Sequence, residues 1–87
     1  MGTKRRPQPR YLGRKLLQIR MNFSLSQEGM AKSLTSKLAP VYPAHISEFE
    51  RGIREPSLLV LLKYAQLADI STDVLIDDKL GLPSNES

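Results

Sequence analysis

Apolar residues recur at helical spacing through most of the chain. Leu12, Leu16 and Ile19 follow an i, i+4, i+7 series, which predicts an amphipathic helix that begins near residue 10. The polar face of this helix would carry Arg14, Lys15 and Gln18. The series breaks between residues 22 and 24, so we expect the helix to end there.

A second helix is predicted to begin after Ser26, whose hydroxyl can accept a hydrogen bond from a backbone N–H of the next turn. Glu28 lies in that turn, where the helix dipole favours an acidic side chain. The inner face would be formed by Met30, Ala31 and Leu34. Leu38 continues the series, which makes residues 36 and 37 candidates for an extension of the helix. Pro40 sets the latest end, because proline disfavours helix in the preceding residue.

Residues 41–43 are predicted to form a turn into a third helix. Pro43 suits the first helical position, where its missing N–H costs no hydrogen bond. Ile46 and Phe49 would face inward at i, i+3 spacing. Gly52 suits the left-handed residue that commonly follows a helix.

Ser57 predicts the start of a fourth helix, for the same reason as Ser26. Its inner face is expected to contain Leu58, Leu61, Leu62 and Ala65. A short fifth helix would begin near Ser71 or Thr72 and carry Val74, Leu75 and Ile76. No alternating run is long enough for a strand. The pattern therefore predicts one all-α domain over residues 10–80, preceded by a flexible basic arm (residues 1–9) and followed by a frayed tail (residues 81–87).

Composition narrows the class of protein. The 87 residues contain no cysteine, which excludes disulfides and Cys-based metal sites. The single His45 has no partner at metal-ligand spacing, and no catalytic motif or phosphate-binding glycine loop is present. We therefore expect neither an enzyme nor a metal, cofactor or small-molecule ligand. No apolar run is long enough to cross a membrane and no signal peptide is visible, which favours a soluble, cytoplasmic protein.

Charge is distributed unevenly along the chain. Residues 1–20 contain seven lysines and arginines and no acidic residue, whereas residues 56–87 have an excess of acidic side chains. A small domain with one basic end can be steered toward a polyanion such as nucleic acid. A solubilising basic tail is the alternative interpretation of the same charges.

Several short motifs, taken in order, resemble one known family. They are Leu25-Ser26-Gln27-Glu28 with Ala31 and Leu34, then Ile46-Ser47 with Phe49-Glu50-Arg51-Gly52, then Arg54-Glu55-Pro56-Ser57-Leu58, and finally Ile70-Ser71-Thr72-Asp73 with Leu75. Together they resemble the lambda-repressor-like (Xre/Cro) helix-turn-helix domains over about Leu12 to Ile76. This resemblance implies a five-helix bundle that binds double-stranded DNA, with its third helix in the major groove. It also implies a sequence-specific regulator of transcription, most often a repressor that pairs as a homodimer on an inverted repeat.

The resemblance also assigns roles to individual residues. Pro43, Ala44 and Glu48 match positions that read base edges, with Ser47 close to them. Because Pro43 and Ala44 offer few polar groups, Tyr42 and His45 are further candidates. Arg20 and Glu50 match a structural ion pair between the first and third helices. Candidates for phosphate contact are Lys4, Arg5, Arg6, Arg10, Asn22, Gln27, Lys37, Arg51 and Arg54.

The spacing between Gln27 and Ile46 is longer than is usual for the family, so several residues are inserted either in the turn or at the end of the second helix. Glu48 has an alternative role as the partner of Arg51, three residues further along. Instead of contacting a phosphate, Gln27 has the alternative role of holding a neighbouring side chain in place.

Candidates for a dimer interface come from the end of the chain: Ile70, Val74, Ile76, Leu80 and Leu82. The same fold also occurs in controllers of restriction systems, phage regulators and antitoxins. A protein-interaction module with an incidental basic arm is the alternative from another class.

Overall fold

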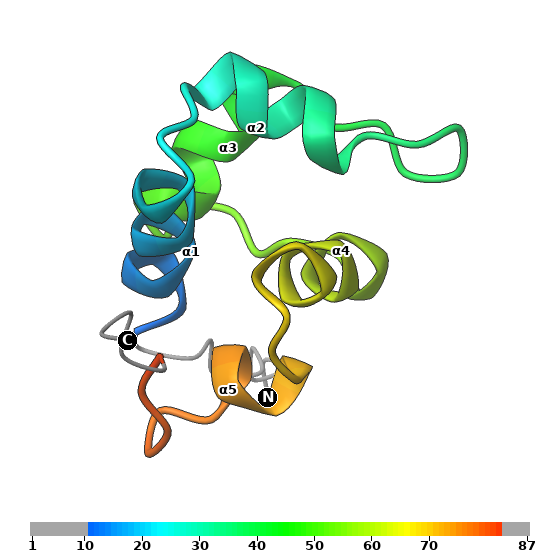
Figure 1. Cartoon of the computed structure of the whole chain (residues 1–87). Helices are drawn as coiled ribbons and strands as arrows, with labels where there is room; N and C mark the ends of the chain where they lie inside the picture. Colours follow the sequence, from blue (N-terminus) through cyan, green and yellow to red (C-terminus); the bar gives the residue numbers. More distant parts are fainter. Residues whose placement is uncertain (1–10, 83–87) are drawn as a thin grey trace, which may run out of the picture.

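The computed structural model of the chain describes residues 11–82, which form five helices and no strand. The helices are α1 (Leu12–Asn22), α2 (Gln27–Leu34), α3 (Pro43–Glu50), α4 (Leu58–Ala68) and α5 (Thr72–Ile76). α2 and α3 pack against each other, α1 packs against α3, α4 and α5, and α4 packs against α5 (Figure 1). The fold class expected from the sequence, an all-α bundle of five helices, is therefore confirmed.

Three helices begin where local chemistry predicts. The Ser26 hydroxyl accepts a hydrogen bond of 2.9 Å from the Gly29 N–H, and Ser57 accepts one of 3.3 Å from the Val60 N–H. Pro43 occupies the first turn of α3. Each hydroxyl satisfies one of the backbone donors that a helix leaves unpaired at its start.

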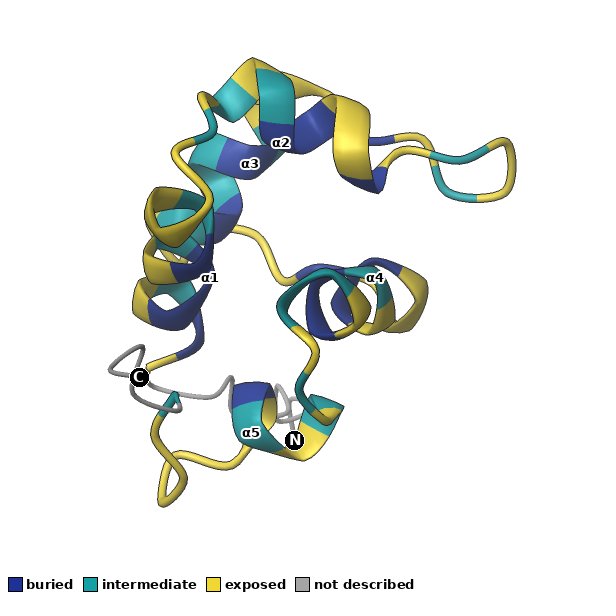
Figure 2. Ribbon diagram, viewed as in Figure 1, coloured by how far each residue is buried: buried dark blue, intermediate teal, exposed yellow. Residues whose placement is uncertain are grey.

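A single apolar core lies between the helices (Figure 2). α1 contributes the three residues that its periodicity predicted, and α3 contributes Ile46 and Phe49. Tyr64 of α4 is completely buried, and burial raises the pKa of its hydroxyl. The buried apolar residues are Leu12, Leu16, Ile19, Met30, Ala31, Leu34, Val41, Ile46, Phe49, Val60, Leu61, Tyr64, Ala65 and Leu75.

Lys15 departs from the sequence pattern, which placed it on the polar face of α1. It is buried, and its Nζ donates hydrogen bonds of 2.7 Å to the Val74 carbonyl and 3.0 Å to the Asp77 carbonyl. These carbonyls lie at the C-terminal end of α5, where unpaired oxygens and the helix dipole favour a cation. The prediction failed because the carbonyl groups that stabilise the buried Lys15 ammonium lie about sixty residues further along the chain.

The predicted extension of α2 through residues 36 and 37 is also wrong. The helix ends at Leu34, and Thr35 is extended. The Thr35 hydroxyl accepts from the Val41 N–H at 2.9 Å, and the Ser36 hydroxyl accepts from the Ala39 N–H at 3.1 Å. These side chains offer the backbone an alternative to further helix. The inserted residues therefore lie in the α2–α3 loop (residues 35–42), which projects from the bundle (Figure 1). This loop contains the exposed Leu38.

The inner face of α4 was only partly predicted. Leu61 and Ala65 are buried as expected, but Leu58 and Leu62 are exposed. Val60 and Tyr64 take their places in the core. α4 is apolar nearly all round, so spacing alone does not tell which face meets the other helices. No helix within residues 11–82 has the length and apolar character needed to span a bilayer.

Candidate nucleic-acid interface

α3 has one face in the core and one face open. Ile46 and Phe49 point inward and are buried. The outer face is made of Ala44, Ser47, Glu48 and Arg51, which follow i, i+3, i+4, i+7 spacing and are exposed or half-buried. We call these four residues the α3 outer face.

The α3 outer face continues into the first turn of the helix. Tyr42, Pro43 and Ala44 are all exposed. The Tyr42 N–H donates to Nδ1 of His45 at 3.4 Å, and the two rings meet edge to face with centroids 5.4 Å apart. His45 also packs against Phe49, with 6.2 Å between ring centroids. His45 is therefore half-buried between Tyr42 and Phe49, whereas Tyr42 projects outward.

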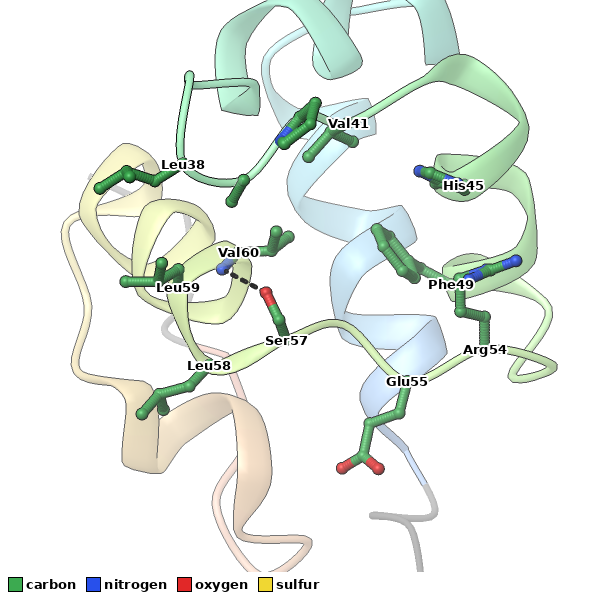
Figure 3. Close-up of a pocket in the computed structure, with 12 residues that line it drawn as sticks. Leu38, Val41, His45, Phe49, Arg54, Glu55, Ser57, Leu58, Leu59 and Val60 are labelled. Carbon is green, nitrogen blue, oxygen red and sulfur yellow. Dashed lines mark hydrogen bonds between the residues drawn. The ribbon is translucent and has the colours of Figure 1, made fainter.

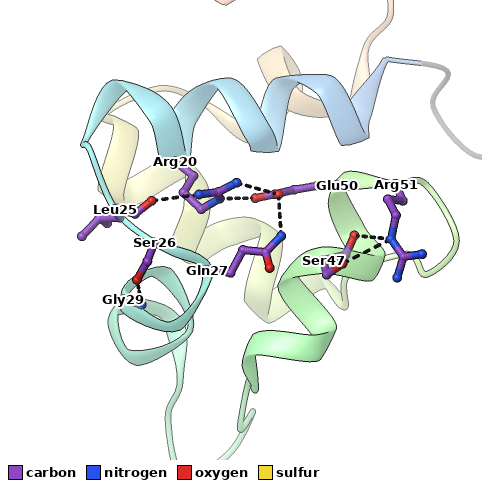
Figure 4. A network of polar contacts seen from close by, with 8 residues as sticks. All are labelled: Arg20, Leu25, Ser26, Gln27, Gly29, Ser47, Glu50 and Arg51. Carbon is purple, nitrogen blue, oxygen red and sulfur yellow. Dashed lines mark hydrogen bonds and ion pairs between the residues drawn. The ribbon is translucent and has the colours of Figure 1, made fainter.

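Three helices are joined by polar contacts around Glu50 (Figure 4). Arg20 of α1 donates to both carboxylate oxygens of Glu50, from Nε at 2.6 Å and from Nη2 at 3.1 Å. Arg20 also donates from Nη1 to the Leu25 carbonyl at 2.9 Å, and Gln27 of α2 donates from Nε2 to Glu50 at 3.3 Å. The hydrogen bond to Glu50 raises the pKa of Arg20. This bidentate arrangement fixes the angle of α3 against α1 and α2.

Gln27 thus lies where the resemblance placed it, at the start of α2, and its amide clamps a neighbouring side chain. Both members of the ion pair are largely buried, with side chains 17% and 6% exposed for Arg20 and Glu50. Such a pair is worth most as a geometric constraint, because desolvation of the two charges offsets much of their attraction.

Glu48 pairs with a different residue from Arg51, the partner considered in the sequence analysis. Its carboxylate forms an ion pair with Nε of Arg54, in the α3–α4 loop. Arg51 instead donates from Nε to the Ser47 carbonyl at 3.3 Å and to the Ser47 hydroxyl at 3.2 Å (Figure 4). The hydrogen bond from Arg54 lowers the pKa of Glu48. The pairing with Arg51 is therefore wrong, because the turn after α3 brings Arg54 within reach.

Other candidates for phosphate contact lie around the same helices. Asn22 is exposed at the end of α1, where it accepts from Nε2 of Gln18 at 2.8 Å. Lys37 is exposed in the α2–α3 loop. The arm residues Lys4, Arg5, Arg6 and Arg10 lie outside the described residues. Within residues 11–82, no group of three or more histidine, aspartate or glutamate side chains is placed to hold a metal ion.

The candidates for a dimer interface are not equally accessible. Ile70 and Leu82 are partly buried against the core, and Val74 is half-buried. Ile76 and Leu80 are 44% and 41% exposed.

An apolar surface on α4 was not predicted from the sequence, and it includes the most exposed of these leucines. Leu58, Leu59 and Leu62 are 76%, 48% and 43% exposed. A groove of about 500 Å³ runs between the start of α4, the α2–α3 loop and α3, with Leu38 on its rim (Figure 3). The unusually apolar composition of α4 is the sequence signal that identifies such a surface, since one helix cannot bury every side.

Comparisons with known proteins agree with this geometry. A family model described as helix-turn-helix matches residues 16–75. No match is found among curated proteins. Among solved structures, the chain is similar to the P22 c2 repressor protein in complex with synthetic operator 9T in the presence of Tl+. That match has a TM-score of 0.66 and 24% sequence identity, and it covers 77% of this chain and 94% of that chain. The likeness shows that the two proteins share a fold.

Proposed function

Because the chain belongs to the lambda-repressor-like helix-turn-helix family, we propose that it is a sequence-specific regulator of transcription that binds double-stranded DNA and acts as a repressor. One observation carries the proposal: the fold buries the inner face of α3 and leaves the α3 outer face open. A helix presented in this way fits the major groove, where every base pair has a distinct pattern of donors and acceptors. A solved structure with a similar fold is that of a repressor protein in complex with a synthetic operator, which supports binding to DNA.

In this proposal, the first two turns of α3 contact base edges. Ala44 offers a methyl group that suits the methyl of thymine. The Tyr42 hydroxyl is both a donor and an acceptor, and Pro43 fixes the direction of the chain as it enters the groove. Ser47 and Glu48 lie one turn further along. His45 contributes by holding Tyr42 through the hydrogen bond to its N–H.

Phosphate contacts supply affinity without sequence preference. Arg51 is the last residue of the α3 outer face, and Lys37 is exposed in the α2–α3 loop. Asn22 at the end of α1 and Gln27 at the start of α2 are further candidates. Basic side chains at residues 4, 5, 6 and 10 add further charge. Arg54 also belongs to this set, through the donors of its guanidinium that Glu48 does not use.

Selection of bound duplexes from a random pool tests the proposal. We expect the full chain to enrich one sequence motif. Titration of the best duplex should then show log affinity falling linearly with log salt, by roughly 0.9 for each phosphate neutralised. Arg51→Ala is expected to weaken binding to all duplexes and to reduce the slope by about one phosphate. A chain that prefers no duplex over random DNA would rule out a sequence-specific regulator.

We also propose that the regulator binds as a homodimer to two half-sites about one helical turn apart, which would block access of polymerase. Two exposed apolar surfaces are available for pairing, one at Ile76 and Leu80 and one at Leu58 and Leu62. Sedimentation equilibrium of Ile76→Glu and Leu58→Glu distinguishes them, because only the variant at the interface should dissociate. A wild-type chain that stays monomeric on its selected duplex would contradict the dimer.

A second candidate function is a protein-interaction module. The groove beside α4 favours it, because Leu38, Leu58 and Leu59 line it and are largely exposed. Exposed apolar patches of this kind mark contacts between proteins. The salt titration separates the two functions, since only binding to a polyanion weakens with the steep slope expected for released counterions.

A further inference from the structure

The turn after α3 returns the chain onto the α3 outer face. Gly52 has a φ of +77°, a conformation that glycine adopts without steric cost. The backbone N–H groups of Ile53 and Arg54 then donate to the Glu48 carbonyl at 3.0 and 3.3 Å. The Arg54 side chain adds the ion pair from Nε to the Glu48 carboxylate. Arg54 is therefore tied to Glu48 through both its backbone and its side chain.

This double attachment controls the Glu48 carboxylate. A glutamate side chain on an exposed helix face normally samples several rotamers, and an ion pair limits that freedom. The basic side chains that face the carboxylate are Arg54, His45 and Arg51, and the pKa of Glu48 is lowered, with the hydrogen bond from Arg54 as the largest cause. An ionised carboxylate accepts hydrogen bonds and donates none.

Building on the proposed function, we propose that Arg54 is a positioning residue that holds Glu48 as a reader of cytosine. In the major groove, cytosine presents an amino donor, whereas guanine and thymine present acceptors that repel a carboxylate. Adenine presents an amino donor beside the N7 acceptor, so a carboxylate also fits it less well. The operator half-site therefore contains a cytosine at the base pair under Glu48.

Arg54 also reduces the electrostatic repulsion between the Glu48 carboxylate and the DNA phosphates. A bare carboxylate close to two strands of phosphates is repelled, and a neighbouring cation offsets that repulsion. The guanidinium has five N–H donors, and Glu48 uses the one on Nε. The terminal amino groups remain able to donate to a phosphate. Arg54 then lies between Glu48 and the DNA backbone, so that one side chain serves both contacts.

The test compares duplex selection by the full-length wild type, Arg54→Ala, Arg54→Lys and Glu48→Gln. In the wild type we expect one position at which cytosine is preferred about tenfold. Arg54→Ala should lower that preference to about twofold, because an exposed ion pair contributes a factor of up to about five. Preferences at other positions should persist. Arg54→Lys should be intermediate, since lysine keeps the charge but not the planar fork. Glu48→Gln should shift the preference toward adenine, whose N6 and N7 match an amide.

A pH series gives a readout that loss of structure alone would not produce. Because Arg54 lowers the pKa of Glu48, the wild type should keep its cytosine preference to lower pH than Arg54→Ala. Arg51→Ala is the matched control, and it should weaken all duplexes without changing the preferred base. If Arg54→Ala weakens all duplexes equally and keeps the cytosine preference, the positioning role is overturned while the proposed function stands. If the wild type enriches no motif, both fail.

Discussion

Gly13 of α1 lies against the backbone of the last turn of α3, and its replacement by alanine offers a sharp test of the packing. A Cβ at residue 13 would lie 2.7 Å from the Glu50 carbonyl oxygen and 3.0 Å from that of Phe49. Both atoms belong to the backbone of the last turn of α3, so no side-chain rotation relieves the clash. α1 and α3 must separate by a few tenths of an ångström or more.

The size of the effect follows from two opposed contributions. Alanine is favoured over glycine in a helix by up to about 1 kcal/mol. Overpacking a tight contact costs about 1–3 kcal/mol. We therefore expect Gly13→Ala to destabilise the fold by about 1 kcal/mol, which lowers the melting temperature of a domain of this size by about 4–8 °C. The shift in α3 should also weaken binding to the selected duplex.

Gly29→Ala in α2 is the matched control. Its Cβ would lie 3.3 Å from Leu25 Cδ2 and 3.3 Å from Ser26 Oγ, which are side-chain atoms that can move. Thermal melting followed by circular dichroism should place Gly29→Ala near or above the wild type and Gly13→Ala clearly below it. Equal melting temperatures for the two variants would refute a backbone contact between α1 and α3 at this position.

Three further variants probe the buried and paired charges. Lys15→Met keeps most of the side-chain volume but removes both hydrogen bonds to α5, so urea unfolding should show a loss of about 2–3 kcal/mol. Glu50→Ala leaves Arg20 largely buried without its partner and should cost about 3 kcal/mol in the same assay; a loss near zero would mean that water readily solvates Arg20. Because Arg54 lowers the pKa of Glu48, that pair stabilises the fold above the ordinary carboxyl range and loses its effect as pH falls through the lowered pKa. The difference in urea midpoint between wild type and Glu48→Gln should therefore shrink on acidification, and a constant difference would contradict the ion pair.

The base-reading and phosphate-contacting roles of individual residues remain predictions. For the candidates within residues 11–82, the structure adds their surroundings: the outer face of α3 is open, and Arg54 is joined to Glu48. The family resemblance could not supply that pairing, because it depends on the turn at Gly52 and on the path of the loop after it.

Local rules determined where α2, α3 and α4 begin and which apolar residues α1 and α3 bury. Ser26, Ser57 and Pro43 act on backbone groups within one turn of themselves. The inward spacing of Ile46 and Phe49 is likewise a property of one helix. The signals that identified these features therefore lie within a few residues of the features themselves.

Only the tertiary structure decided which groups the charged side chains pair with. It also decided which apolar side chains are buried in a helix that is apolar on several sides. Lys15 is buried because the end of α5 supplies acceptors for it. Leu58 is exposed and Tyr64 is buried because α4 has one core-facing side and several apolar ones. The burial of Lys15 depends on a group that is distant in sequence, and the exposure of Leu58 depends on competition between equivalent faces. α2 ends at Leu34 because the Thr35 and Ser36 side chains accept hydrogen bonds from the loop that follows, six and three residues further along. Periodicity along the chain encodes none of these causes.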